Sequence, residues 1–175
     1  SYGLTDSGAK LLIADEERID RFNQIEEKLD IAIISVRAVK EHPYDSLEAL
    51  LEQATDKDMP EQRPLPESDA TILYTSGSTG HPKGVVSCHV NIIHALLGWE
   101  LEQQCALALL DESPPEPPDS PATLLAVPLF HATGSHAVYL ASYRHQRRIV
   151  SMYKWDVTEA AEIIEREKIT SFIAP

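Results

Sequence analysis

The stretch Thr75–Gly84 combines side chains and backbone features that could bind a phosphate group. It reads Thr-Ser-Gly-Ser-Thr-Gly-His-Pro-Lys-Gly, with three glycines, four hydroxyl side chains and one lysine. Glycine lets the backbone adopt a positive φ and come close to a ligand. Successive backbone N–H groups and hydroxyls can then surround an anion, and Lys83 adds a full positive charge. The stretch is therefore a candidate phosphate-binding loop.

The Walker A loop is the first phosphate-binding motif to compare with this stretch. That motif requires a glycine, four further residues and then Gly-Lys-Ser/Thr. Here Gly77 is followed by Ser-Thr-Gly-His-Pro and only then by Lys83. Pro82 stands where the second glycine belongs, and Gly84 stands where the hydroxyl residue belongs. The two mismatches disfavour a P-loop-type NTPase, which stays as an alternative.

The segment Tyr74–Gly84 closely resembles the phosphate-binding signature of the adenylate-forming superfamily. That superfamily contains acyl-CoA synthetases, firefly-type luciferases and the adenylation domains of peptide synthetases. The resemblance implies that a carboxylate attacks the α-phosphorus of ATP, and that a thiol, usually that of CoA, then displaces AMP. It also implies that the β- and γ-phosphates of ATP are held by Thr75, Ser76, Gly77, Ser78, Thr79, Gly80 and Lys83.

A second informative segment is Pro128-Leu-Phe-His-Ala-Thr-Gly134. It is similar to a segment of acyl-CoA-forming members of the superfamily, in which the histidine lies near the acyl group and the adenylate. The resemblance places Phe130, His131 and Gly134 in the acyl and adenylate pocket, with Gly134 permitting close packing beneath it. Peptide-synthetase domains usually carry an aspartate directly after the phenylalanine, so His131 disfavours a free amino acid as substrate. A buried histidine bonded to the backbone is the competing interpretation of His131.

Composition limits the remaining function classes. The chain has 175 residues, of which 43% are hydrophobic and 25% charged, and its net charge is −13. A length of this order fits one domain with its own core. The acidic balance disfavours nucleic-acid binding, whereas a phosphate site depends on local amides and one or two cations. Two cysteines and no long apolar run favour a reducing cytoplasm and argue against a membrane span.

The histidine pairs and Cys88 could also suggest chemistry, but a structural role is favoured for them. The histidine pairs His89/His94 and His131/His136 are spaced by five residues, whereas helical metal ligands are spaced by four, so metal binding is disfavoured. Cys88 is interpreted as a small core residue.

Apolar runs that predict strands alternate with patterns that predict helices. Asp45 or Ser46 can cap one helix, and Asp156-Val-Thr-Glu159 forms a capping box for another. The alternation predicts an α/β fold with a mostly parallel sheet and helices on both faces. We expect linkers at 55–68 and 111–121, strands at 10–14, 31–36, 70–75, 85–88, 123–127, 147–152 and 169–175, and helices at 15–29, 47–54, 89–110, 135–143 and 156–168.

The chain begins in a pattern typical of a helix end and stops on a strand. Together with the resemblance, this predicts that residues 1–175 are a fragment of a large N-terminal AMP-binding domain whose C-terminal domain is absent. The resemblance places the glutamate that binds Mg²⁺ and the catalytic lysine outside these residues. No catalytic residue or metal ligand is therefore assigned within the chain.

The resulting hypothesis is that the parent protein is an ATP-dependent carboxylate–CoA ligase, an acyl-CoA synthetase of fatty acid metabolism. It would use ATP, Mg²⁺ and CoA with a small carboxylic acid, in the cytoplasm. The alternatives are activation of aryl or amino acids, a P-loop-type NTPase, and a non-catalytic nucleotide-binding module. We expect the isolated fragment to be inactive and to self-associate.

Overall fold

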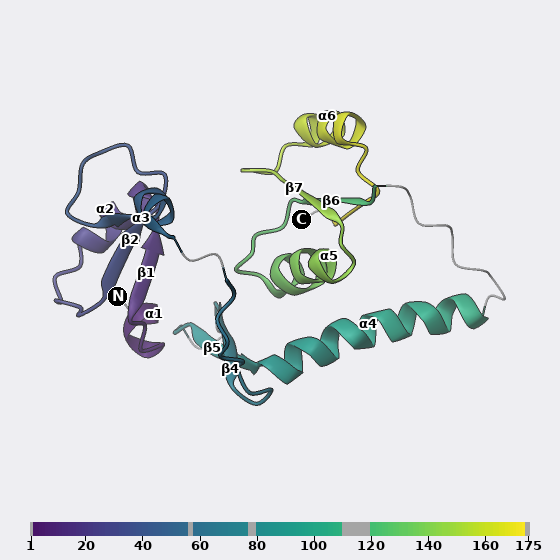
Figure 1. Cartoon of the computed structure of the whole chain (residues 1–175), viewed down its shortest axis with the longest axis horizontal. Coiled ribbons are helices and arrows are strands. Elements are labelled where there is room, and N and C mark those ends of the chain that lie inside the picture. The colour runs from purple at the N-terminus through teal and green to yellow at the C-terminus, as the bar shows by residue number, and fades with distance from the viewer. Residues whose placement is uncertain (1, 56–57, 77–79, 110–119, 174–175) are drawn as a thin grey trace. The chain divides into compact units, whose positions relative to one another are not determined.

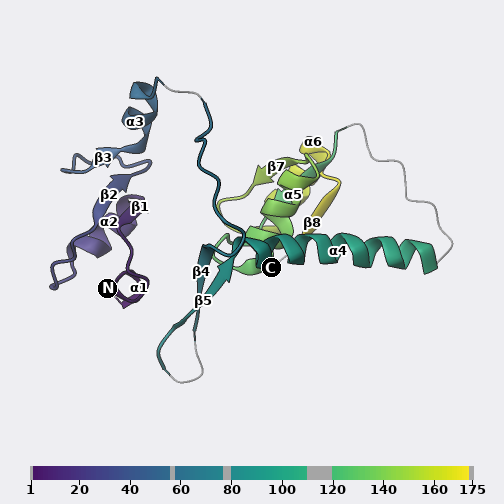
Figure 2. The ribbon, with the colours of Figure 1, turned by 60° about the horizontal axis from the view of Figure 1, so that its bottom comes forward.

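A computed structural model describes residues 2–55, 58–76, 80–109 and 120–173 (Figures 1 and 2). The chain divides into two compact units, Ser1–Arg63 with Ser76–Gly84 and Pro64–Thr75 with Val85–Pro175. The described strands form two three-stranded sheets and one two-stranded pair. Both three-stranded sheets are parallel, which confirms the α/β class, although the strands do not join into one sheet.

The first unit is built around a small parallel sheet with the strand order β1-β2-β3. Leu11 lies opposite Ala32, and Ile34 lies opposite Asp45. The core contains the buried residues Ala14, Ile19 and Ile33, against which Leu12, Phe22 and Tyr44 pack. The elements in chain order are α1 (Tyr2–Asp6), β1 (Leu11–Ala14), α2 (Glu16–Asn23), β2 (Ala32–Ser35), β3 (Asp45–Ser46) and α3 (Leu47–Gln53).

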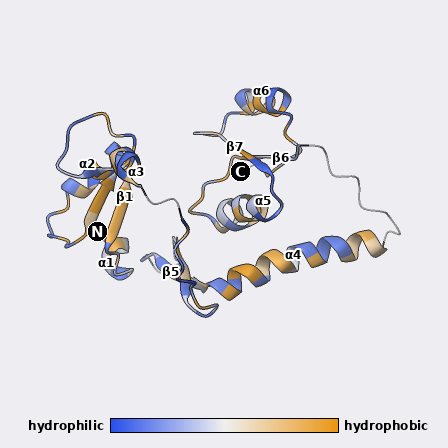
Figure 3. Ribbon diagram, viewed as in Figure 1, coloured by the Kyte–Doolittle hydropathy of each residue, from blue (hydrophilic) through white to orange (hydrophobic). Residues whose placement is uncertain are grey.

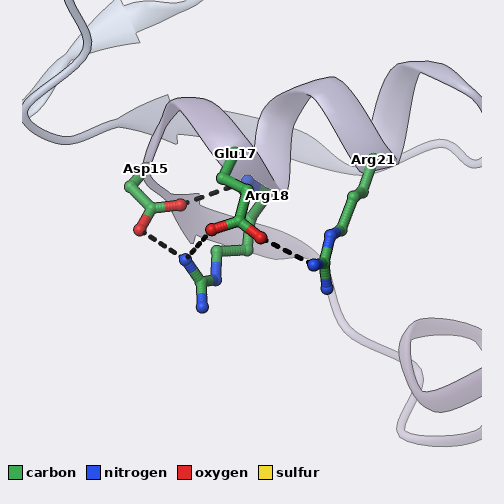
Figure 4. A network of polar contacts seen from close by, with 4 residues as sticks. All are labelled: Asp15, Glu17, Arg18 and Arg21. Atoms are coloured by element: carbon green, nitrogen blue, oxygen red, sulfur yellow. Dashed lines mark hydrogen bonds and ion pairs between the residues drawn. The ribbon is translucent and has the colours of Figure 1, made fainter. Parts of the chain in front are cut away.

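Helix α2 begins with a network of exposed charges, drawn in Figure 4. The Asp15 carboxylate accepts a hydrogen bond from the backbone N–H of Arg18 at 3.1 Å, which caps the helix. The Arg18 guanidinium also contacts Asp15 at 2.8 Å and Glu17 at 3.2 Å, and Arg21 contacts Glu17 at 2.6 Å. Acidic residues in a first turn and arginine in a last turn also suit the helix dipole.

The predicted extent of this helix, 15–29, is wrong, because α2 ends at Asn23. The Tyr44 hydroxyl donates a 2.8 Å hydrogen bond to Asn23 Oδ1 across the unit. The N–H of Ile25 then bonds the carbonyl of Phe22, which closes a tighter turn than an α-helix has. The helix therefore ends before Ile25 and Leu29, which its apolar periodicity alone would include.

The second unit has the parallel strand order β7-β6-β8 in its three-stranded sheet. Its central strand, β6, is buried at all four positions. The elements in chain order are β4 (Asp69–Thr75), β5 (Lys83–Cys88), α4 (His89–Leu109), β6 (Ala122–Leu125), η1 (Thr133–Leu140), α5 (Ala141–Arg144), β7 (Arg148–Ser151), α6 (Val157–Glu167) and β8 (Ser171–Ile173). The first two residues of β5 fall in the range assigned to the first unit.

Helices cover both faces of this sheet, as the sequence predicts (Figure 1). On one face, Leu124 packs with Ala160 and Ile163 of α6. Successive side chains of a strand point to opposite faces. Thr123 accordingly faces the other side, where it lines a cavity of about 120 Å³ with Ala137 of η1 and other residues. The strand β6 is thus enclosed by helices on both sides.

The segment after β6 differs from the ordinary helix predicted for 135–143. It begins earlier, at Thr133, and winds as a π-helix to Leu140 before α5 continues it to Arg144. Short π-helical turns occur mostly inside helices and frequently at functional sites. In this one, Gly134, His136 and Val138 are buried.

Strands β4 and β5 form a separate two-stranded pair. The connection 76–82 is shorter than a parallel crossover requires, so the pair is a hairpin. The helix α4 follows directly, and its extent agrees with the prediction to within one residue. Figure 3 shows hydrophobic and hydrophilic residues mixed along α4. The hydrophobic residues Ile93, Leu97 and Leu101 are exposed. Within the described ranges, no helix combines the length and apolar character needed to cross a bilayer.

Candidate functional site

A cavity of about 390 Å³ lies in the second unit. It is bounded by the hairpin β4–β5, the first half of α4 and the segment that enters η1. Most of its lining is apolar or aromatic, with a few polar groups, which is the composition of small-molecule sites. The lining residues are Leu73, Tyr74, Thr75, Val85, Ser87, Asn91, Ile92, Ala95, Trp99, Phe130, His131, Ala132 and His136.

The cavity brings together residues from both motifs that the sequence analysis singled out. Thr75, the first residue of the candidate phosphate loop, shares the lining with Phe130 and His131. These motifs lie on elements that are distant in the sequence, the end of β4 and the approach to η1. The fold thus places one end of the phosphate loop at the predicted acyl pocket.

The structure describes only part of the candidate phosphate loop. Thr75, Ser76, Gly80 and Lys83 are exposed, whereas Gly77, Ser78 and Thr79 lie outside the described residues. Gly80 has a φ of 90°, a conformation that favours glycine over other residues. Thr75 ends β4 and Lys83 begins β5, so a hydroxyl and an ammonium group stand at the two ends of the connection.

The ring of His131 is fixed by its own backbone. Its Nδ1 accepts a 3.2 Å hydrogen bond from the N–H of Thr133. Its backbone N–H donates to the carbonyl of Pro128, and its carbonyl accepts from the N–H of Ser135. The residue is exposed, as is Phe130 at 77%, so His131 is not the buried histidine of the competing interpretation.

Gly134 packs so closely that no larger residue fits. A Cβ atom added to it would lie 2.2 Å from the carbonyl oxygen of Pro128 and 2.6 Å from that of Val127. Atoms at these distances would overlap, so the backbone would have to shift. The structure thus shows close packing at Gly134, which holds residues 127–128 against the start of η1. Gly134 is not among the residues that line the cavity, so its place in the acyl pocket stays a prediction.

Several residues of the cavity were not predicted from the sequence, among them Asn91, Trp99 and His136. His136 was considered only as half of a metal-binding pair, and the described residues contain no group of three side chains suited to hold a metal. Asn91 accepts hydrogen bonds from the N–H of Cys88 at 3.2 Å and from its Sγ at 2.9 Å. Cys88 is half-buried, so its interpretation as a core residue is not supported.

Beside the cavity, an exposed charge cluster connects α4 to α5. The carboxylate of Glu100 contacts Arg144 Nη2 at 2.9 Å and His145 Nε2 at 3.2 Å, and it also contacts Arg144 Nε. The hydrogen bond and charge of Arg144 lower the pKa of Glu100 below its ordinary value, and Glu100 raises the pKa of Arg144. The cluster therefore favours the ionised forms of both groups.

Comparisons with known proteins find similarity along almost the whole chain. The sequence profile of the AMP-binding enzyme family matches residues 1–175. A 4-coumarate–CoA ligase of Nicotiana tabacum is 28% identical over 171 residues, covering 97% of this chain and 30% of that protein. A 2-succinylbenzoate–CoA ligase of Geobacillus kaustophilus is 33% identical over 175 residues, covering 97% and 29%. The chain thus spans about three tenths of the length of these relatives.

A solved structure has the same fold. It is O-succinylbenzoate coenzyme A synthetase from Bacillus subtilis in complex with ATP and magnesium ion. It superposes with a TM-score of 0.68 at 22% identity, covering 98% of this chain and 30% of that one.

Proposed function

The chain belongs to the AMP-binding enzyme family, and from this membership we propose that the full-length protein is an ATP-dependent carboxylate–CoA ligase. In the proposed reaction a carboxylate oxygen attacks the α-phosphorus of ATP, which releases pyrophosphate and leaves an acyl-adenylate. The thiol of CoA then attacks the acyl carbon, giving a thioester and AMP. The names of the two relatives support this class. The single observation that carries the proposal is that Thr75 and His131 line one cavity.

The proposed work of this chain is to bind and position the reactants. The loop hydroxyls and amides, from Thr75 to Gly80, together with Lys83, would hold the β- and γ-phosphates. Phe130 and His131 would form a wall for the acid. Positioning of this kind can supply a large part of a rate enhancement without any covalent role for the protein.

We assign no magnesium ligand among the described residues. The described residues contain no cluster of three histidine, cysteine, aspartate or glutamate side chains. Magnesium commonly binds through one or two carboxylates together with substrate phosphates. We therefore derive no step from the ion, and we place its carboxylate ligand in the remainder of the full-length protein, together with the catalytic lysine. In the same proposal, residues 1–175 are part of a larger N-terminal AMP-binding domain.

The identity of the carboxylic acid substrate is a prediction. The two relatives are named for 4-coumarate and 2-succinylbenzoate, and His131 in place of an aspartate disfavours free amino acids. A role in fatty acid metabolism, a cytoplasmic location and self-association of the isolated fragment are also predictions that the structure does not test.

Product analysis of the full-length protein tests the proposal. We expect AMP and pyrophosphate to form from ATP only when a suitable carboxylic acid is present, in a screen of aryl, fatty and amino acids. Formation of ADP and phosphate without an acid would instead support the P-loop-type alternative. A protein that binds nucleotide but turns over none of these acids would be a non-catalytic module.

A further inference from the structure

His136 is a buried residue of η1 that belongs to the cavity lining. It is 7% exposed. Its Nδ1 lies 2.8 Å from the hydroxyl oxygen of Ser135. The same hydroxyl lies 3.0 Å from the carbonyl oxygen of His131, to which it donates. A short chain of polar contacts thus connects His136 to the backbone of His131.

The protons of this chain can be assigned from its chemistry. A carbonyl oxygen only accepts hydrogen bonds, so the single hydroxyl proton of Ser135 is used on His131. The Ser135 oxygen must then accept from His136, which requires that His136 Nδ1 carry a proton. In a neutral imidazole the other nitrogen, Nε2, is consequently an acceptor with a lone pair.

His131 has the opposite arrangement. Its Nδ1 accepts from the N–H of Thr133, so a neutral His131 carries its proton on Nε2 and is a donor there. Two histidines of one cavity thus have complementary hydrogen-bonding roles. The donor on His131 suits the carboxylate or phosphate oxygens of the reacting end. The acceptor nitrogen of His136 needs an N–H or O–H donor, and the carboxylate and phosphate oxygens of the proposed reaction offer none.

The accessible nitrogen of His136 supports a ligand-binding role. In the described part of the chain, three side-chain atoms are sealed from solvent without a hydrogen-bond partner: His42 Nδ1, Thr71 Oγ1 and Ser142 Oγ. His136 Nε2 is not one of them, although the described residues offer it no hydrogen bond. We infer that this accessible nitrogen faces the cavity, because His136 belongs to the cavity lining.

We propose that His136 Nε2 accepts a hydrogen bond from the bound acid and selects acids whose acyl group carries an O–H or N–H donor. This inference rests on the proposed function, because it takes the cavity to be the site of the acid. The lining is mainly apolar, so an acid without a donor would leave the acceptor unpaired. A donor-bearing acid satisfies it.

Pairs of acids that differ by one hydroxyl test the inference in the full-length protein. We would compare phenylpropanoic acid with its 2-, 3- and 4-hydroxy derivatives. For at least one position we expect a kcat/KM about 10-fold or more above that of the plain acid. His136→Phe should bring this ratio near one. His136→Gln, whose amide oxygen is an acceptor, should restore part of it. His94→Phe, an exposed position outside the cavity lining, is the control and should keep the wild-type ratio.

A spectroscopic arm does not depend on turnover. Long-range ¹⁵N–¹H correlations of the histidine-labelled protein should show the proton of His136 on Nδ1 and that of His131 on Nε2. Adding the preferred hydroxy acid should shift the His136 Nε2 resonance, and the plain acid should not. A proton on Nε2 of His136, or equal ratios for wild type and His136→Phe, would overturn the inference. If no acid gives AMP, the proposed function fails, and the resonance shift alone decides the role of His136.

Discussion

Strand β6 differs from the strands β4 and β5 in how it is stabilised. All four residues of β6 are buried, and helices cover both of its faces. In β4 and β5, whose residues the structure describes throughout, none is buried. Phe130 and His131 follow β6 closely, whereas the phosphate loop connects the two strands of the hairpin.

The difference indicates how the site is prepared for its ligands. The His131 side is attached to a packed core and locked by the contact of Gly134 with Pro128. The hairpin strands contain no buried residue, so burial of apolar side chains contributes less to their stability than it does to that of β6. We therefore expect the acid-binding wall to be formed before ligands arrive, and ligand phosphates to contribute to the stability of the loop side.

Leu124→Ala should have the largest effect on stability. Leu124 is fully buried between β6 and α6, and truncation of such a side chain costs about 3 kcal/mol of unfolding free energy. Val86→Ala on β5 is the matched control, because Val86 is 52% exposed and should lose roughly 1 kcal/mol or less. Urea denaturation measures both. Equal losses would show that the two strands are supported alike.

Gly134→Ala should have the next largest effect. Its Cβ would overlap the carbonyl oxygens of Val127 and Pro128, and relief of such overpacking costs about 2 kcal/mol. Gly98→Ala in α4 is the control, since nothing lies within 4 Å of its Cβ and alanine favours a helix by roughly 0.5–1 kcal/mol. Thermal unfolding should therefore move in opposite directions for the two variants. An unchanged unfolding temperature for Gly134→Ala would show that the contact of Gly134 with Pro128 does not stabilise this segment.

The smallest effect should come from the exposed Glu100 cluster and should depend on pH. Arg144 lowers the pKa of Glu100 in the folded protein from its ordinary value of 4.5. The contribution to stability is therefore fully present above that value, and it is lost as the pH falls through the lowered pKa. Solvent screening keeps it small.

The measurement is the stability difference between wild type and Glu100→Gln from pH 7 down to pH 3. It should shrink as Glu100 becomes protonated. Glu102→Gln is the control. Glu102 lies two residues after Glu100 in α4 and has no ion pair among the described residues. A difference that grows on acidification would contradict the assigned pair.

Local chemistry made much of the fold predictable. Ser46 and Asp156 cap α3 and α6 as expected, because a cap depends on a side chain and an amide three residues away. The early end of α2 was not predicted, because Ile25 and Leu29 continue the apolar spacing of the helix beyond Asn23. The extent of the π-helix was also missed, since its apolar pattern resembles that of an ordinary helix.

The candidate site divides in the same way. Thr75, Phe130 and His131 were predicted from motifs, and the structure places them on one cavity. His136 was not assigned a role, because its significance comes from the proton arrangement of Ser135 and the His131 carbonyl. That arrangement exists only in the folded segment.

The most direct test of the proposed function, in which Lys83 contacts ATP and His131 contacts the acid, is a comparison of KM values in the full-length protein. Lys83→Ala should raise the KM for ATP by about 10-fold or more, because it removes a charge-assisted contact, and should leave the KM for the acid nearly unchanged. His131→Ala should raise the KM for the acid and affect that for ATP less. Wild-type values of both constants in both variants would contradict the account.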